Sequence, residues 1–364
     1  MNRRGVCYDV GRVMLGQDWR PEFSAAEARR ELEIIGTDQR CNAVRICGHD
    51  LDRLMVAGTI ALDQGLEVWF SPELWDHTPQ DTLDYIAAAA GRAAELHRHR
   101  PGRVVFSIGS ELTLFMAGIL DGNSVFERLQ HPSFWEHVRS GAHNAPLNAF
   151  LAEANDRVRQ VFGGSVTYAS VPLETVDWSR FDFVSVDLYR DARIRDRFGD
   201  VLGRYFAHGR PVAITEFGCC TYRGAADAGG RGFAIIDYPA SVGDGTPPRL
   251  NGRYVRDEPE QASEVTELLT IFGQAGVDAT FVMTFVAPLN PYSADPMYDL
   301  DMASYSLVTS YGGRLGPLGA AYPQAPWDRD LLGTTYRDMP WQPKESFTAV
   351  ASYYAAQGTR PGLT

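Results

Sequence analysis

The stretch AVRICGHDLDRLMVAGTIALDQGLEVWFS, residues 43–71, contains a strand, a helix and a second strand in that order. Ala43–Cys47 and Leu66–Ser71 are short and largely apolar, which is typical of strands buried on both faces of a parallel sheet. Leu51–Asp63 between them has a helical pattern, and Asp50 stands where an N-cap is expected. A helix that connects two such strands is the repeating unit of α/β folds.

The same unit recurs along the chain. Six further apolar runs are bounded by glycine or polar residues: Gly5–Val10, Arg103–Ile108, Ser165–Val171, Phe181–Leu188, Pro211–Thr215 and Asp278–Phe285. Helical patterns follow most of them: Ala25–Ile35, Thr82–His97, Pro146–Phe162, Ile194–Ala207, Pro259–Ala275 and Lys344–Ala356, whereas Pro172–Arg180 has room for one turn. Eight strands that alternate with helices predict an α/β protein with the (β/α)8 TIM-barrel fold, built as one domain from residues 1–364.

The residues beyond a minimal barrel fall in the loops after the fourth, seventh and eighth strands. Gly218–Arg256 and Asn290–Gln342 are long for connections in a compact domain, which favours functional loops. Loops that follow strands form the active face of such a barrel. The alternative fold is an open, doubly wound sheet. It predicts a glycine-rich turn after the first strand, and this sequence has none there.

Composition and charge exclude several classes of protein. Hydrophobic residues make up 45% of the 364 residues, which excludes a disordered or fibrous chain. The net charge of −12 disfavours nucleic acid and anionic membranes as partners and favours neutral or cationic ones. The five cysteines, at 7, 41, 47, 219 and 220, form no disulfide framework, and no apolar segment follows the N-terminal arginines. We therefore expect a cytoplasmic protein. Its oligomeric state stays open.

Two glutamates stand just beyond predicted strands. Glu111 follows the fourth strand and Glu216 follows the seventh. The ends of these strands face one another across a barrel mouth, so the two carboxyls are expected to converge on one substrate. Retaining glycoside hydrolysis needs such a pair, about 5–5.5 Å apart: one carboxylic acid protonates the leaving oxygen and one carboxylate attacks the anomeric carbon.

Around these glutamates the chain resembles the clan-A retaining glycoside hydrolases. VVFSIGSEL resembles their acid/base motif, with Glu111 as acid/base, and PVAITEFG resembles their nucleophile motif, with Glu216 as nucleophile. NAVRI is similar to the second-strand segment whose arginine, here Arg45, contacts the nucleophile, and FVSVDLY to the sixth strand, whose aromatic, here Tyr189, bonds to it. The resemblance implies cleavage of a β-linked O-glycosidic bond by double displacement, with no cofactor and no metal.

Two positions depart from the clan pattern. The residue before the acid/base is usually an asparagine that binds the sugar 2-hydroxyl, whereas this chain has Ser110; a small hydroxyl there is similar to the family 113 β-mannanases. The eighth strand often ends in a tryptophan that carries the sugar, whereas this chain has Phe285. Both differences predict an altered sugar-recognition surface.

Other polar and aromatic residues near strand ends are candidate substrate contacts. Asp9 follows the first strand and either lines the floor of the site or caps a turn. His49 follows the second strand and is expected to touch substrate. Four aromatic residues offer rings that match the apolar C–H faces of sugars, although each is also a common loop anchor: Trp75, Trp178, Tyr222 and Tyr292.

We expect no metal site. His97 and His99 have an His-x-His pattern, but they end a predicted helix rather than a strand. Asp295, Asp299 and Asp301 lack the spacing and glycine of an EF-hand, so a solvated loop is expected there.

Two alternatives to hydrolysis stay open. The first is a glycosidase-like barrel repurposed for specialised-metabolite or transglycosylation chemistry, which Ser110 and Phe285 motivate. The second is a non-catalytic carbohydrate-binding barrel. The presence of both glutamates together with Arg45 argues against the second, because a binding protein has no need of two converging carboxyls.

Overall fold

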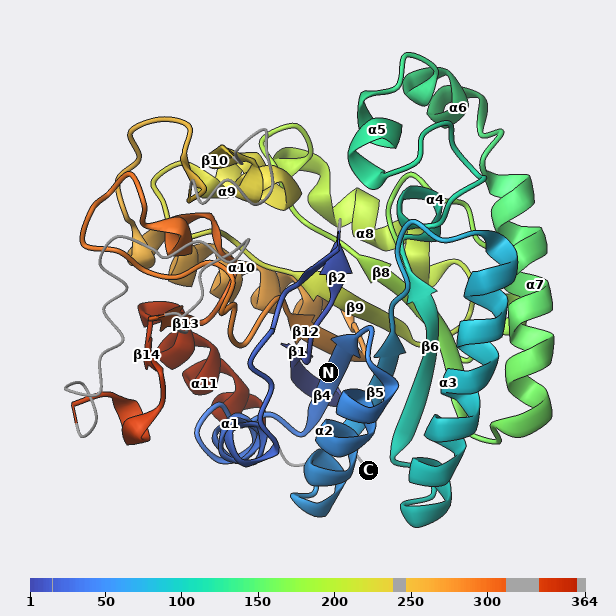
Figure 1. The fold of residues 1–364 in the computed structure, drawn as a ribbon, viewed down its shortest axis with the longest axis horizontal. Helices are drawn as coiled ribbons and strands as arrows, with labels where there is room; N and C mark the ends of the chain where they lie inside the picture. The colour runs from blue at the N-terminus through green and yellow to red at the C-terminus, as the bar shows by residue number, and fades with distance from the viewer. Residues whose placement is uncertain (15, 238–246, 312–333, 359–364) are drawn as a thin grey trace.

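Eight parallel strands close into a barrel in the computed structural model, which describes residues 1–14, 16–237, 247–311 and 334–358. Going round the barrel, each strand pairs with its neighbours in the order β1-β12-β9-β8-β7-β6-β5-β4, and β1 closes the ring by pairing with β4 (Figure 1). The strands are β1 Arg3–Asp9, β4 Ala43–Gly48, β5 Glu67–Pro72, β6 Val104–Ser110, β7 Ser165–Ser170, β8 Val184–Asp187, β9 Val212–Phe217 and β12 Ala279–Val282. The predicted (β/α)8 fold is confirmed, and each strand begins and ends within three residues of its predicted bounds.

Helices surround the barrel as the sequence predicted. They are α1 Ala25–Thr37, α2 Leu51–Asp63, α3 Pro79–His99, α7 Asn144–Val161, α8 Phe198–Phe206, α10 Glu258–Ala275 and α11 Glu345–Gly358. The cap predicted at Asp50 is present, because its carboxylate accepts the backbone N–H groups of Asp52 and Arg53. The single turn expected after the fifth strand is the 3-10 helix η1, Trp178–Arg180.

The added segments lie after the fourth, seventh and eighth barrel strands, also as predicted. After β6 come α4 Leu112–Phe115, α5 Val125–Gln130 and α6 Phe134–Ser140. After β9 come α9 Ala225–Ala228, η3 Gly229–Ile235, β10 Ile236–Asp237 and β11 Arg249–Leu250. After β12 come η4 Leu300–Ala303, β13 Val308–Ser310, η7 Tyr336–Asp338 and β14 Trp341–Pro343. A small hairpin, β2 Val13–Met14 and β3 Gln17–Asp18, follows β1, and η2 Arg195–Arg197 precedes α8. Residues 238–246 and 312–333 of the two long predicted loops lie outside the described residues.

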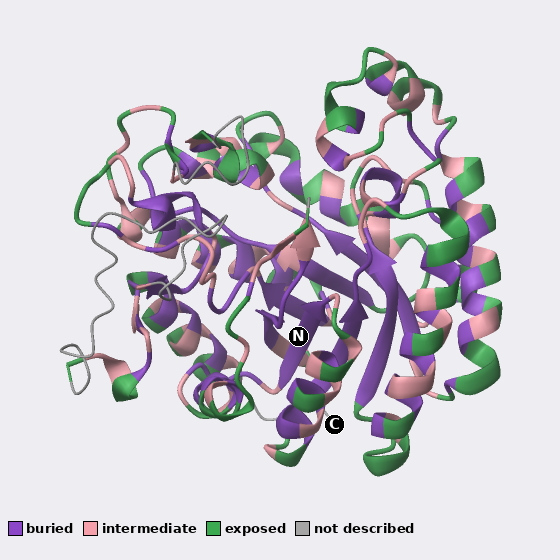
Figure 2. Cartoon of the chain, in the orientation of Figure 1, coloured by how far each residue is buried: buried purple, intermediate pink, exposed green. Residues whose placement is uncertain are grey.

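The barrel interior is filled by apolar side chains in the half where the strands begin. Trp69 packs against Phe183 and Phe281, with ring centroids 5.0 and 4.9 Å apart, and its Nε1 donates to Glu67. Small residues such as Ala43 and Ala213 complete this plug. A second apolar core lies between the outer faces of the strands and the helices (Figure 2). The charged side chains of the candidate site, such as Arg45 and Glu216, lie beyond this plug, toward the ends of the strands.

A buried ion cluster ties the loops after β9 and β12 to the start of α11. The Asp301 carboxylate lies 2.8 Å from the guanidinium of Arg256 and 2.9 Å from the ammonium of Lys344, and Asp299 lies 3.0 Å from Arg256. The Lys344 ammonium also donates to the hydroxyl of Thr221 at 2.8 Å. The expectation of a solvated acidic loop is therefore wrong for Asp299 and Asp301, because both side chains are buried opposite cations.

We expect Asp301→Ala to destabilise the protein by about 3–5 kcal/mol, because it leaves the buried Lys344 without its counter-charge. Urea unfolding at neutral pH measures this loss. The control is Asp156→Ala, which removes an exposed pair with Arg180 and should cost less than about 1 kcal/mol. Equal, small losses in the two variants would contradict the importance of the cluster.

Candidate active site

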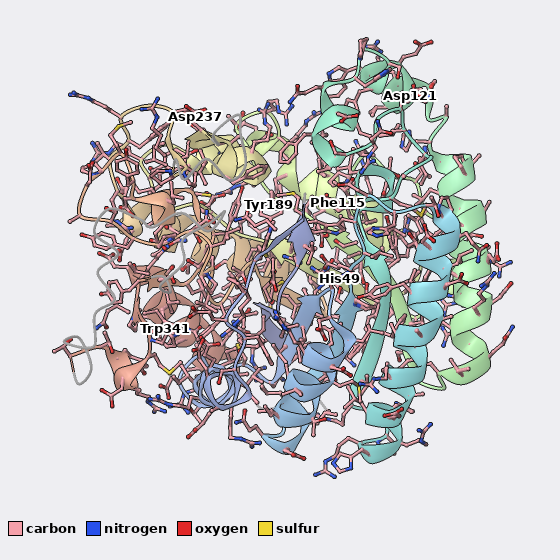
Figure 3. The ribbon with its side chains drawn as sticks, viewed as in Figure 1. His49, Phe115, Asp121, Tyr189, Asp237 and Trp341 are labelled. Carbon is pink, nitrogen blue, oxygen red and sulfur yellow. The ribbon has the colours of Figure 1, made fainter. Side chains whose placement is uncertain are left out.

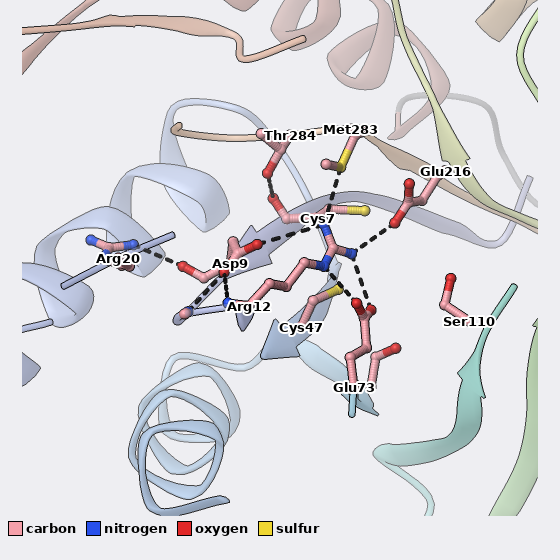
Figure 4. A network of polar contacts seen from close by, with 12 residues as sticks. Cys7, Asp9, Arg12, Arg20, Cys47, Glu73, Ser110, Glu216, Met283 and Thr284 are labelled. Atoms are coloured by element: carbon pink, nitrogen blue, oxygen red, sulfur yellow. Dashed lines mark hydrogen bonds and ion pairs between the residues drawn. The ribbon is translucent and has the colours of Figure 1, made fainter. Parts of the chain in front are cut away.

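Glu216 on β9 lies at the centre of a cluster of charged side chains. One of its carboxylate oxygens, Oε1, accepts a hydrogen bond from Arg45 Nη1 at 2.7 Å and another from Arg12 Nη2 at 2.8 Å. Its second oxygen, Oε2, accepts from the hydroxyl of Tyr189 at 3.2 Å. Arg45 and Tyr189 therefore both contact Glu216, and so does Arg12. Figure 4 shows Arg12 between Glu216 and Glu73.

Glu73, just past β5, holds both arginines in place. Arg12 donates to its carboxylate through Nε at 2.6 Å and Nη2 at 3.1 Å, and Arg45 Nη2 lies 3.4 Å away. The two-pronged contact fixes the plane of the Arg12 guanidinium, as bidentate carboxylate pairs do. Two cations and two carboxylates are thus buried together. Neither Arg12 nor Glu73 belongs to a motif that the sequence analysis used, and both were missed.

The pKa of Glu216 is set by two opposing effects. Burial alone would raise it, but the positive charges and hydrogen bonds of Arg12 and Arg45 outweigh burial and lower the pKa below its usual value. Glu216 is therefore ionised at neutral pH. A carboxylate held in this state can act as a nucleophile.

Glu111 has the opposite environment. It follows Ser110, the last residue of β6, in a left-handed backbone conformation with φ 49° and ψ 42°. Burial raises the pKa of its carboxyl well above the usual value, and the nearby carboxylates of Asp187 and Glu216 raise it further. The environment of Glu111 therefore favours the protonated form of its carboxyl. The site therefore contains one carboxyl whose surroundings favour the acid and one whose surroundings favour the carboxylate, which is the combination that glycoside chemistry uses.

Ser110 is hydrogen-bonded to a further buried carboxyl, that of Asp187. Its hydroxyl donates to Asp187 Oδ2 at 2.8 Å, and Asp187 Oδ1 lies 3.8 Å from Arg45 Nη1. Burial, followed by the charge of Glu216, raises the pKa of Asp187 to about 7. The pairing register shifts between Ser107 and Ser110 and again beside Asp187. Such irregularities re-aim side chains at strand ends. Asp187 was missed, although it lies within the quoted FVSVDLY segment.

Asp9 serves the turn that carries Arg12. Its Oδ1 accepts the backbone N–H groups of Gly11 at 2.7 Å and Arg12 at 2.9 Å, and its Oδ2 lies 3.6 Å from Arg12 Nη1. Of the two alternatives for Asp9, the structure therefore shows the turn cap. This cap also fixes the backbone from which Arg12 reaches Glu216.

A wall of part-exposed aromatic rings stands beside this cluster. Trp75 stacks on Phe115, with centroids 4.3 Å apart, and meets Trp19 edge-on at 5.5 Å. The guanidinium of Arg12 lies 5.8 Å from the Trp19 ring and 6.0 Å from the Trp75 ring. Trp75 also lines a small pocket, partly open to solvent, together with Ser110 and other residues that include Glu73 and Leu112. Trp19 and Phe115 had not been predicted as site residues.

The remaining candidates do not join the cluster. His49 stacks on Tyr85, with centroids 5.6 Å apart, and is partly exposed. In Figure 3 the label of His49 lies below those of Phe115 and Tyr189. Tyr292 lies over the guanidinium of Arg256, in the buried ion cluster of the loops.

Three of the predicted substrate contacts are wrong, because their rings are buried in packed structure. Phe285 is fully buried between Trp341 and Phe347, on the helix side of the barrel. Trp178 packs edge-on against Phe181 and His208. Tyr222 packs on Tyr254 and donates its hydroxyl to the carbonyl of Gly232. The physical reason is common to all three: a large apolar ring near a strand end packs in the core unless a cavity lies before it.

No cluster of three or more His, Cys, Asp or Glu side chains in the described ranges is arranged to hold a metal ion. Of the histidine pair, His97 packs edge-on against Phe162, and His99 lies 3.5 Å from Asp63. Among the helices of the described residues, none is long and apolar enough to span a membrane.

The solved structures that this chain resembles include clan-A glycoside hydrolases of families 113 and 5, in agreement with the resemblance in the motifs. A family 113 β-1,4-mannanase matches with a TM-score of 0.55 at 12% identity, over 98% of this chain and 100% of that chain. The family 113 β-mannanase of Alicyclobacillus acidocaldarius, in complex with ManMIm, matches with a TM-score of 0.53 at 16% identity, over 98% and 97%. A family 5 lichenase from Caldicellulosiruptor sp. F32, in complex with cellotetraose, matches with a TM-score of 0.54 at 14% identity, over 96% and 92%. The sequence itself matches no family profile and no curated protein. At these identities the likeness establishes the fold.

We expect Arg12→Met and Arg45→Met each to raise the pKa of Glu216, because each removes a positive charge that favours the carboxylate. A carbon-13 NMR titration of glutamate-labelled protein measures this, with Glu216→Gln to assign the signal. Arg53→Met is the control, since Arg53 pairs with Asp18 outside the cluster. An unchanged titration of Glu216 in both test variants would show that the arginines do not set its charge.

Proposed function

We propose that this protein is a retaining glycoside hydrolase in which Glu111 is the acid/base and Glu216 the nucleophile. The observation that supports this best is the pair of opposite pKa shifts: the environment of Glu111 favours its protonated form, and that of Glu216 its ionised form. The similarity of the fold to clan-A glycoside hydrolases also supports this chemistry, although a fold does not determine function by itself.

The proposed reaction has two displacements. In the first, Glu216 attacks the anomeric carbon while Glu111 gives its proton to the glycosidic oxygen, so the C–O bond breaks and the aglycone leaves as an alcohol. In the second, Glu111 removes a proton from water, and the resulting hydroxyl displaces Glu216 from the anomeric carbon. The sugar is released with its original anomeric configuration, and both carboxyls return to their starting states.

The arginine cluster supports both displacements. When Glu216 becomes an ester it loses its negative charge, and Arg12 and Arg45 would be left with a buried excess of positive charge. Glu73 takes no part in the reaction and contacts both arginines, so they keep a partner and their positions. We infer that this lets Glu216 leave again as a carboxylate without reorganising the site.

We propose a β-linked oligosaccharide or β-glycoside as substrate. The similar solved structures are described as a β-1,4-mannanase and as a lichenase bound to cellotetraose. In this chain the part-exposed rings of Trp19, Trp75 and Phe115 offer an apolar surface for sugar C–H faces. A cytoplasmic location is proposed in the same way, on five buried, free cysteines.

Azide separates the roles of the two glutamates. In Glu111→Ala, an aryl substrate with a good leaving group should still form the glycosyl-enzyme, and azide, which needs no general base, should intercept it and give a β-glycosyl azide. In Glu216→Ala, azide should attack the substrate directly and give the opposite anomer. NMR of the two azide products measures this.

Glu153→Ala, an exposed residue of α7, is the control and should behave as wild type. Identical anomers from the two test variants would overturn the assigned roles. No turnover of any glycoside by the wild-type protein would favour a carbohydrate-binding barrel instead.

The pH dependence of kcat/KM should be bell-shaped. Activity is lost as pH falls through the lowered pKa of Glu216, because the nucleophile becomes protonated, and as pH rises through the raised pKa of Glu111, because the acid loses its proton. Because Glu111 and Glu216 interact, the two limbs of the pH profile report apparent pKa values of the pair rather than of either residue alone. A profile with a single, acidic limb for a substrate with a poor leaving group would contradict the role of Glu111.

A further inference from the structure

We propose that Tyr168 and Glu174 form a clamp that positions Glu111 as the proton donor. The inference rests on the proposed glycosidase reaction and adds two positioning residues to it. Tyr168 belongs to β7, the strand next to β6 in the barrel, and Glu174 to the loop that follows β7. Neither residue belongs to the charged cluster around Glu216.

The backbone turn at Glu111 is held at three successive amides. The N–H of Glu111 donates to the carbonyl of Ala169 at 2.8 Å. The next N–H, of Leu112, donates to the hydroxyl of Tyr168 at 2.7 Å, and that of Thr113 to Glu174 Oε1 at 3.1 Å. A left-handed conformation is unfavourable for a residue with a side chain, so it persists only where neighbours enforce it. These three bonds provide that enforcement, and all three acceptors come from β7 or its loop.

The two clamp residues are themselves locked together. The Tyr168 hydroxyl donates to the Glu174 carboxylate, with both oxygens 2.9 Å away, while it accepts the N–H of Leu112. Glu174 Oε2 also accepts the N–H of Val171 at 3.1 Å. Tyr168 is fully buried, so its hydroxyl has a fixed direction. The geometry of the turn therefore depends on one rigid phenol and one carboxylate that is bonded at both oxygens.

Glu174 also contributes charge to the surroundings of Glu111. The groups that act on the pKa of Glu111 are Asp187 on β8, Glu216 on β9 and Glu174, whose negative charges raise it, and Arg45 on β4, which lowers it. An acid catalyst must be both correctly aimed and protonated. The hydrogen bonds of the clamp orient Glu111, and the negative charge of Glu174 favours its protonated form.

The dependence of rate on leaving group tests the clamp. Proton donation matters most for a poor leaving group, so Tyr168→Phe and Glu174→Gln should lower kcat/KM by about 10-fold or more for alkyl or unsubstituted phenyl glycosides. For a dinitrophenyl glycoside, which hardly needs a proton, the loss should stay within about 2-fold. In Glu174→Gln the basic limb of the pH profile should also move to lower pH, because a negative charge near Glu111 is removed.

Tyr354→Phe is the matched control. Tyr354 is a buried tyrosine of α11 whose hydroxyl donates to the carbonyl of Gly5 at 3.0 Å, on the outer side of the barrel. Loss of this hydroxyl should change all substrates by the same factor. An equal loss across the leaving-group series in the two clamp variants would overturn the proposal, since it would show a general structural role.

Amide hydrogen exchange tests the clamp independently of catalysis, because it needs no substrate. The amides of Leu112 and Thr113 should exchange faster in Tyr168→Phe than in wild type, and those of α11 should not change. Unchanged exchange at both amides would overturn the clamp even if the enzyme is active. Faster exchange in a protein that hydrolyses no glycoside would support the hydrogen bonds of the clamp but contradict the proposed function. The clamp would then have no role in catalysis.

Discussion

The site depends on the sharing of two guanidiniums between two carboxylates inside the barrel. Any one of these charges would be costly to bury alone, and removing a single partner from such a group leaves an uncompensated charge. Arg12, Arg45 and Glu73 come from the neighbouring strands β1, β4 and β5 or from the turns after them, whereas Glu216 is reached across the barrel on β9. The charges can therefore neutralise one another only when the barrel is closed, which links the state of Glu216 to completion of the fold.

Much of the fold was predictable from local pattern. A strand buried on both faces must be almost wholly apolar, and a helix that packs on it must show its own periodicity, so the alternation of the two is visible in one sequence. The two glutamates were predictable for a related reason. A charged residue directly after an apolar run is conspicuous, and barrel topology dictates that the ends of all eight strands meet at one face.

The rest of the site could not be found in this way. Arg12 and Glu73 lie in short turns, where charged residues are common, and only the three-dimensional contacts distinguish them from solvated side chains. The errors at Trp178, Tyr222 and Phe285 have the converse cause: an aromatic ring near a strand end has the same sequence signature whether it faces the mouth of the barrel or packs against the helices. Asp299 and Asp301 were misjudged because their counter-charges, Arg256 and Lys344, are distant in sequence.

The apolar plug around Trp69 determines how molecules reach and leave the proposed site. Because it fills the half of the barrel where the strands begin, substrate, water and products must all pass through the opening at the ends of the strands. In the proposed reaction the departing alcohol therefore leaves along the path by which water arrives. While the alcohol is still in that passage it competes with water for the glycosyl group. The residence time of the first product, rather than the chemistry of the ester alone, then sets how often the bond is remade and how often it is hydrolysed.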